Sequence, residues 1–176
     1  MKSLLLALGL LVPGLAWAAA GDYVENYDTI YNSLTVERRG SIVELRARAR
    51  GGEALESAVD LNDPLRLVVH YTRSLYGALF IAPEPKRVLM IGLGGAGFHR
   101  LFSAAFPDSL LHTVELDPKV LELCESRMEF KRTERTPVTL MDGRMFVKHN
   151  RDTWVASSNS FWAREYADPE AKAKVL

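Results

Sequence analysis

One stretch of this sequence, RVLMIGLGGAGFHR starting at Arg87, restricts the possible folds more than any other. Its apolar part, Val88–Ile91, predicts a buried strand, and a helix pattern begins at Phe98. Without Cβ atoms the loop between them can turn tightly and approach a ligand, and the helix start offers free N–H groups. The loop alone leaves open a dinucleotide site, an S-adenosyl site and a tight turn without a ligand. Its spacing is G-x-G-x-x-G with one extra glycine, and its glycines are Gly92, Gly94, Gly95 and Gly97.

Strand and helix patterns alternate after residue 86. This order is typical of an α/β fold with a Rossmann-like, doubly wound parallel sheet. Strands are expected at Val88–Ile91, Leu110–Glu115 and Val138–Met141, and helices over Phe98–Phe106, from Asp117-Pro118 onward and after Asp142-Gly143-Arg144.

The segment before this core has a different pattern. Two antiparallel strands are expected in YNSLTVERRG and SIVELRARAR, with a turn at Arg38-Arg39-Gly40. In the second strand, apolar residues alternate with charged ones, which predicts one buried and one solvated face. Asp63-Pro64 then predicts the start of a helix that runs to Leu79, because Asp is a good N-cap and Pro suits the first helical position.

The two ends of the chain lack the patterns of the core. Residues 1–20 combine Lys2, the apolar stretch Leu4–Leu15 and small residues around Ala18, as in an export signal. The apolar run is shorter than the roughly 20 residues that span a bilayer; a retained anchor is the alternative. Residues 151–176 offer Thr153–Ala156 as their best, weak strand. We therefore divide the chain into a signal (1–20), an N-terminal hairpin region with a helix (21–82), a nucleotide-binding Rossmann-like core (83–150) and an atypical tail (151–176).

Composition and charge exclude several classes of function. The chain has 176 residues, of which 48% are hydrophobic and 25% charged, and its 22 basic residues balance its 22 acidic ones. This balance indicates neither a nucleic-acid partner nor binding to an anionic membrane surface. The four histidines are scattered, and the single cysteine, Cys124, lies on the apolar stripe of an expected helix. No metal site is therefore expected.

Two acidic residues at strand ends narrow the class of ligand. Glu115 ends the second core strand, where an acid accepts hydrogen bonds from ribose hydroxyls; a solvent-exposed acid is the alternative. Asp142, followed by Gly143, comes after the third strand and is placed to accept a hydrogen bond from an adenine amino group. Asp117 has the pattern of a helix cap. The loop and Glu115 suit NAD and an S-adenosyl nucleoside equally, whereas Asp142-Gly143 favours the S-adenosyl nucleoside.

The segments between Tyr31 and Asn150 resemble the spermidine synthase family, whose members transfer aminopropyl groups and have the class I methyltransferase fold. VLMIGLGGAGFHR resembles that family's first strand and glycine loop, HTVELDPKVLELC its second strand and helix, and VTLMDGRMFV its adenine-side segment. YNSLTVERRGSIVEL resembles the small antiparallel sheet that covers the active site. The resemblance implies decarboxylated S-adenosylmethionine, or S-adenosylmethionine itself, as the cofactor, and a small-molecule amine as the acceptor. It implies the loop of residues 92–97 around the cofactor tail, Glu115 on the ribose and Asp142 near the adenine.

The chain departs from that family in three places. The family's loop carries an aspartate that anchors the aminopropyl amine, and Gly95 stands at that position here. The family's acceptor-binding segment is not recognisable in SAVDLNDPL, and no fourth strand with its catalytic aspartate is recognisable after residue 150. We therefore assign no catalytic residue from the sequence.

A missing fourth strand would have a structural consequence. It would leave the strand Val88–Leu93 with an unpaired apolar edge, and such an edge invites pairing or aggregation. The expectation is then a truncated or frame-disrupted relative, or a chain that needs a second copy or another partner over this edge.

Several functions follow from these observations. The first is a spermidine synthase-like transferase in which aminopropyl transfer is impaired. The second is an S-adenosylmethionine-dependent methyltransferase, which needs no aspartate in the loop. A non-catalytic binding or interaction domain is the third, and an NAD dehydrogenase a distant fourth. The expected export places the protein in the periplasm, or anchored by an uncleaved signal, away from cytoplasmic polyamine synthesis.

Overall fold

Two β-sheets and four helices make up the described part of the chain. The computed structural model describes residues 21–49, 52–77, 85–150, 155–156 and 162–164. The first sheet holds four antiparallel strands in chain order: β1 (Tyr23–Asp28), β2 (Ser33–Arg39), β3 (Ile42–Ala49) and β4 (Gly52–Asp60). The second has the order β7-β6-β5-β9-β8, with β5 (Arg87–Ile91), β6 (Leu110–Glu115), β7 (Val138–Leu140), β8 (Val155–Ala156) and β9 (Trp162–Arg164). The helices are α1 (His70–Gly77), α2 (Gly97–Ala105), α3 (Pro118–Arg127) and α4 (Gly143–His149).

The parallel core agrees with the sequence-based expectation. β5 pairs with β6 and β6 with β7, both in parallel, so β6 lies between the other two. The predicted cap at Asp117 is present, because its side chain accepts a hydrogen bond from the Lys119 N–H at 2.9 Å. Asp142, which the sequence placed near an adenine, also caps a helix, accepting from the Met145 N–H at 3.0 Å. Such caps satisfy N–H groups that have no partner within the helix. The expected Rossmann-like fold class, preceded by an antiparallel sheet, is confirmed.

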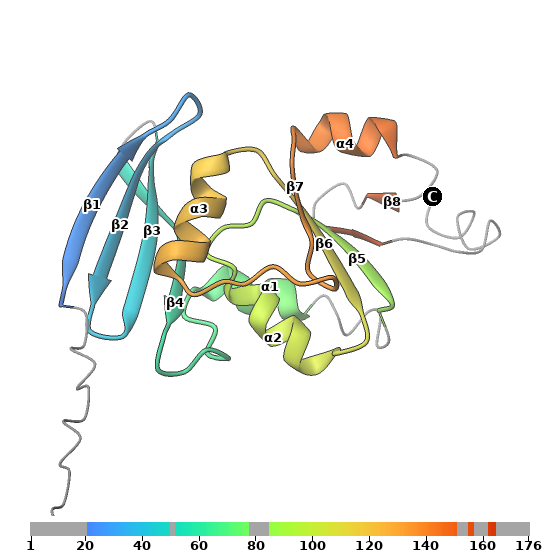
Figure 1. Cartoon of the computed structure of the whole chain (residues 1–176), viewed down its shortest axis with the longest axis horizontal. Coiled ribbons are helices and arrows are strands. Elements are labelled where there is room, and N and C mark those ends of the chain that lie inside the picture. Colours follow the sequence, from blue (N-terminus) through green and yellow to red (C-terminus); the bar gives the residue numbers. More distant parts are fainter. Residues whose placement is uncertain (1–20, 50–51, 78–84, 151–154, 157–161, 165–176) are drawn as a thin grey trace, which may run out of the picture.

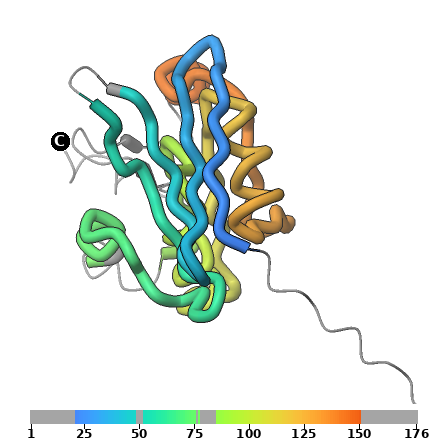
Figure 2. The backbone as a smooth tube through the Cα atoms, turned by 90° about the vertical axis from the view of Figure 1, so that its left-hand side faces the viewer, coloured from blue at the N-terminus to red at the C-terminus, as the bar shows by residue number. Residues whose placement is uncertain are grey.

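The antiparallel sheet is larger than predicted. The two expected strands are β2 and β3, and their turn is at Gly40, whose φ of 59° suits glycine. Beyond them, β1 pairs with β2 and β4 with β3. Figure 1 shows this sheet on one side of α3 and the second sheet on the other. In Figure 2, turned by 90°, its strands run side by side along the core.

The predicted long helix from Asp63 to Leu79 is wrong over its first part. The helix α1 begins only at His70, and residues 78–84 lie outside the described ranges. The Arg66 N–H donates to the Asp63 carbonyl at 3.0 Å, which makes a single turn. Asp60 holds this turn, because its carboxylate accepts from the Arg66 guanidinium, also at 3.0 Å. The β-branched residues Val68 and Val69 then weaken the propagation of a helix from it.

The expectation of an unpaired edge on β5 is also wrong. The strand β9 pairs antiparallel with β5, with Val88 opposite Arg164 and Met90 opposite Trp162. β8 covers the other side of β9. An extended β5 backbone has N–H and C=O groups that need partners, and a strand of three residues supplies them without a readable hydrophobic pattern. Because β9 is antiparallel, it is not the parallel fourth strand of the family. With this edge paired, the structure removes the stated reason for a covering partner.

The antiparallel sheet and α3 share one hydrophobic core. Cys124 is fully buried in it, as predicted, and its thiol donates to the Gly94 carbonyl at 2.7 Å. Polar contacts also join the two layers: the Arg127 guanidinium donates to both oxygens of Glu25, at 2.8 and 3.1 Å. The apolar members are Leu34, Val36, Val43, Leu45, Ala47 and Val59 from the sheet, Leu93 and Ala96 from the glycine loop, Val120, Leu121, Leu123 and Cys124 from α3, and Met128 and Phe130 after it.

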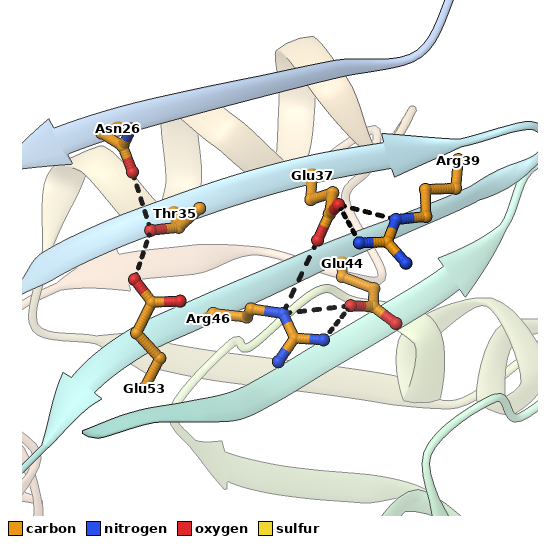
Figure 3. Close-up of polar contacts among 7 residues, drawn as sticks. All are labelled: Asn26, Thr35, Glu37, Arg39, Glu44, Arg46 and Glu53. Atoms are coloured by element: carbon orange, nitrogen blue, oxygen red, sulfur yellow. Dashed lines mark hydrogen bonds and ion pairs between the residues drawn. The ribbon is translucent and has the colours of Figure 1, made fainter. Parts of the chain in front are cut away.

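The opposite face of the antiparallel sheet is polar, as the alternating pattern of β3 predicts. Figure 3 shows Arg46 between Glu44 and Glu37, and Thr35 between Asn26 and Glu53. Pairs of partly exposed charges on such a face contribute little to stability. Within the described ranges, no helix is long and apolar enough to span a membrane, and the expected signal at residues 1–20 lies outside those ranges.

Candidate functional site

The glycine loop is shaped by residues with positive φ. Gly92 has a φ of 91° and Gly94 a φ of 57°, conformations in which a side chain is strained. The Gly92 N–H donates to the Val114 carbonyl at 2.8 Å, which anchors the loop to the end of β6. A Cβ at Gly92 would have open space within 4 Å. The backbone at Gly92 is therefore accessible to a ligand.

The other predicted glycines do not share this openness. A Cβ at Gly95 would lie 2.5 Å from Ser57 Oγ and 2.9 Å from Met128 Sδ, and one at Gly143 would lie 2.5 Å from Ile91 Cγ2. At Gly97 the nearest atom, on Val59, would be at an ordinary 3.6 Å. Gly95 and Gly143 thus let neighbouring elements approach each other, which is a packing role. The sequence pattern cannot separate this role from ligand binding.

Glu115 lies beneath the loop and organises it. One carboxylate oxygen, Oε2, accepts from the Leu93 N–H at 2.7 Å, and the other, Oε1, accepts from the Asp117 N–H at 2.9 Å. The residue is only 8% exposed. A carboxylate has about four acceptor positions, so about two remain for ribose hydroxyls. The predicted position at the end of β6 is therefore compatible with ribose binding, and Glu115 has a structural role in addition.

Asp117 connects Glu115 to the antiparallel sheet. Its Oδ2 accepts from the Thr29 hydroxyl at 2.6 Å, while its Oδ1 caps α3. Thr29 belongs to the turn between β1 and β2, which it also holds by accepting from the Asn32 N–H at 2.9 Å. The turn of the first hairpin is thus fixed next to the acid that supports the glycine loop.

Apolar side chains near Glu115 and Asp142 are more exposed than usual. The Met141 N–H donates to the Glu115 carbonyl at 2.9 Å, which brings the ends of β6 and β7 together. Asp142 is partly exposed there, and hydrogen bonding to the Met145 N–H holds the pKa of its carboxyl below the usual value. Sequence reasoning missed these apolar residues, although their positions within three residues of the two acids are a usable signal. They are Leu116, Leu140, Met141 and Met145, with exposed fractions of 41, 47, 43 and 45%.

A cleft of about 310 Å³ opens beside the loop. The Tyr71 hydroxyl donates to the Glu56 carbonyl at 2.6 Å and so ties α1 to β4 across it. Burial is the main cause that raises the pKa of Tyr71. The sequence did not point to this cleft, because β4 and α1, which line it together with the glycine loop, carry no motif. Its lining consists of Leu55 and Glu56 from β4, Tyr71 and Leu75 from α1, Met90 and Ile91 from β5, and the loop residues Gly92, Leu93 and Gly94.

Two buried side chains near the loop, Cys124 and His99, remain uncharged near neutral pH. Burial raises the pKa of the Cys124 thiol far above its usual value, so the thiolate nucleophile does not form near neutral pH. Burial lowers the pKa of His99 to about 3, so the ring is neutral near neutral pH, and its Nε2 lies 2.6 Å from the Thr113 hydroxyl. Among the described residues, no group of His, Cys, Asp and Glu side chains could hold a metal ion.

Comparison with known proteins shows which proteins this chain is similar to. No family model matches the chain. A polyamine aminopropyltransferase of Chromobacterium violaceum is 31% identical over 105 residues, which cover 59% of this chain and 40% of that protein. An "eEF1A lysine and N-terminal methyltransferase homolog" of Drosophila pseudoobscura pseudoobscura is 43% identical over 67 residues, which cover 38% of this chain and 10% of that one.

The fold is also found among solved structures. The crystal structure of a protein described as a probable spermidine synthase, from Corynebacterium glutamicum, superimposes with a TM-score of 0.59 at 22% identity, over 71% of this chain and 47% of that one. The chain spans about two fifths of the length of the aminopropyltransferase it matches. The chain is therefore similar in sequence to polyamine aminopropyltransferases and shares its fold with a protein described as a probable spermidine synthase.

Proposed function

We propose that this protein binds an S-adenosyl-type nucleoside at the carboxyl ends of β5, β6 and β7. The observation that carries the proposal is the position of Glu115 directly beneath the glycine loop, where it accepts from the Leu93 N–H at 2.7 Å. In parallel α/β sheets, ligands bind at this edge, with a strand-end acid on the ribose. The open backbone at Gly92 then receives the part of the nucleoside attached to the ribose.

Exposed apolar side chains and an acid support binding of the adenine at the other end of the proposed site. Leu116 and Met141 are 41 and 43% exposed beside the two acids and offer apolar contact to the faces of a base. Asp142 keeps a low pKa, so its carboxylate is ionised near neutral pH and can accept from the adenine amino group. Asp142 also caps α4 through Oδ1, which accepts from the Met145 N–H. The adenine amino group would therefore donate either to the same oxygen or to Oδ2.

The proposed ancestral reaction is transfer of an aminopropyl group to a polyamine. An amine nitrogen attacks the carbon next to the sulfonium of decarboxylated S-adenosylmethionine, and methylthioadenosine leaves. The amine must first lose a proton, because an ammonium is no nucleophile. The family's catalytic aspartate is not recognisable in this sequence, so we propose that this transfer is impaired here. The match to polyamine aminopropyltransferases supports the reaction class.

A methyltransferase is the second candidate function, with S-adenosylmethionine as the donor. The similarity over 67 residues to the eEF1A methyltransferase homolog favours it. So does Gly95, because its contacts with Ser57 and Met128 leave no room for the aspartate that an aminopropyl donor would use. A binding or interaction domain without catalysis is the third candidate, which the lack of a recognisable catalytic aspartate in this sequence favours.

Calorimetric titration of the purified chain tests the binding proposal. Methylthioadenosine, decarboxylated S-adenosylmethionine and S-adenosylmethionine are the three ligands. We expect saturable binding of methylthioadenosine, because the nucleoside part supplies the contacts to Glu115 and Asp142. Heat from none of the three ligands would contradict the proposal. Methyl transfer with S-adenosylmethionine, without aminopropyl transfer from its decarboxylated form, would select the second candidate.

We also propose that the protein is exported to the periplasm. The support is the sequence of residues 1–20, with Lys2 before an apolar run and small residues around Ala18. N-terminal sequencing of the protein from its natural host is expected to begin near residue 19 or 21. A start at Met1 or Lys2 would instead favour a retained anchor.

A further inference from the structure

An irregularity in β4 places an acidic residue beside the glycine loop. In the pairing of β3 with β4, Leu45 lies opposite Ser57 and Arg46 lies opposite Leu55, so Glu56 is the extra residue of a β-bulge. Bulges redirect side chains and are common next to active sites. The Tyr71 hydroxyl fixes this bulge through its 2.6 Å hydrogen bond to the Glu56 carbonyl. Glu56 is thereby held at the cleft that Gly92 and Gly94 also line.

No residue of the described ranges pairs with the exposed carboxylate of Glu56. Glu56 is the one charged residue among the described residues that line the cleft. Its negative charge contributes to the raised pKa of Tyr71, which places the carboxylate near that phenol. A lone carboxylate in a partly apolar cleft favours a positively charged group beside it.

The rest of the lining suits a hydrocarbon chain. Leu55, Leu75 and Met90 are apolar, and Leu55 is 38% exposed although it is a large apolar side chain. The other acid near the loop, Glu115, is already engaged with two backbone N–H groups. Gly95 has no space for an acidic side chain, since its Cβ would lie 2.5 Å from Ser57 Oγ.

We propose that Glu56 binds the ammonium group of an aliphatic amine whose methylene groups pack against Leu55, Leu75 and Met90. This inference rests on the proposed nucleoside site, because an amine bound to Glu56 would lie next to the sulfur of the bound nucleoside. Two molecules carry this chemistry: the aminopropyl tail of decarboxylated S-adenosylmethionine, and a separate diamine that acts as acceptor. The ammonium and methylene chain are the same in both.

The variant Glu56→Gln separates these sources, with Glu53→Gln as the matched control. Glu53 lies on the same strand but on the outer face of the sheet, where it accepts from Thr35 (Figure 3). Each protein is titrated with methylthioadenosine, with decarboxylated S-adenosylmethionine, and with 1,4-diaminobutane after saturation with methylthioadenosine. Methylthioadenosine has no ammonium group and reports whether the nucleoside site is intact.

Loss of the charged hydrogen bond is expected to weaken the ammonium-bearing ligand about tenfold or more in Glu56→Gln, with methylthioadenosine unchanged. Weaker binding of the decarboxylated cofactor alone assigns Glu56 to its tail, and weaker binding of the diamine alone assigns it to the acceptor. Equal affinities of both ammonium ligands for the parent and Glu56→Gln would overturn the assignment, as would an equal loss in Glu53→Gln. Failure of methylthioadenosine to bind the parent protein would overturn the proposed nucleoside site, and the Glu56 assignment with it.

Discussion

Replacement of Gly95 by alanine is expected to lower the free energy of unfolding by about 1–3 kcal/mol, the usual cost of an overpacked core. The new Cβ would meet Ser57 Oγ at 2.5 Å and both Met128 Sδ and Ser57 Cβ at 2.9 Å. Met128 can move its thioether, but Ser57 Cβ is fixed by the backbone of β4. Because Ser57 and Met128 are 2% and 0% exposed, the clash cannot be relieved into solvent.

Urea unfolding of Gly95→Ala measures this cost, and Gly97→Ala is the matched control. A Cβ at Gly97 would meet its nearest atom at 3.6 Å, and Ala is a better helix former than Gly, so Gly97→Ala is expected to be neutral or slightly stabilising. In a Ser57→Gly background, Gly95→Ala should cost less, because the double mutant removes the fixed Cβ contact. Equal stability of Gly95→Ala and the parent protein would show that the loop and β4 do not pack as described.

The crowding around Gly95 also explains why the loop has no space for the aspartate that the family resemblance places at this position. Gly95→Asp restores the residue type that the family resemblance places in the loop, but it also adds a carboxylate where even a methyl group is crowded. Its destabilisation should exceed that of Gly95→Ala, because a buried charge without a partner adds a desolvation cost. A single substitution is therefore not expected to produce an aminopropyl anchor in this loop.

The core could be predicted from the sequence because its signals are local. A short apolar run and a glycine loop each determine their own backbone, and Asp117 caps its helix as expected, whereas the Asp63-Pro64 signal did not start one. The strand ends of β5 and β6 then bring Gly92 and Glu115 together without any further information. Prediction from the sequence succeeds where a conformation is determined by residues that are adjacent in the sequence.

The cleft could not be predicted because its causes are distant in the sequence. Glu56 reaches the loop only through a bulge that depends on the register of β3 against β4, and Tyr71 of α1 holds that bulge by a hydrogen bond. Nothing in the sequence ALES of residues 54–57 indicates that Glu56 lies beside the glycine loop. The strand β9 was missed for a related reason, since its pairing with β5 follows from the unpaired backbone of β5 and not from a pattern of its own.

Glu115→Gln is expected to destabilise the protein by about 1–3 kcal/mol, the cost of a buried N–H without an acceptor. The glutamine keeps one oxygen but presents an NH₂ group in place of the other. Either the Leu93 N–H or the Asp117 N–H, which now donate at 2.7 and 2.9 Å, then loses its acceptor. Thermal and urea unfolding should both report the loss, since Glu115 is only 8% exposed and water cannot easily replace the missing oxygen.

The effect of Glu115→Gln on binding must be separated from this effect on the loop. Methylthioadenosine and its 2′,3′-dideoxy analogue differ only in the ribose hydroxyls, so the ratio of their dissociation constants isolates the hydroxyl contacts. In the parent protein, we expect the dideoxy analogue to bind about tenfold or more weakly, because a hydrogen bond to a charged group contributes about 1.5–3 kcal/mol. In Glu115→Gln this ratio should fall toward one. If both ligands weaken equally and the ratio is unchanged, Glu115 supports the loop without touching the ribose, and the ribose assignment is wrong.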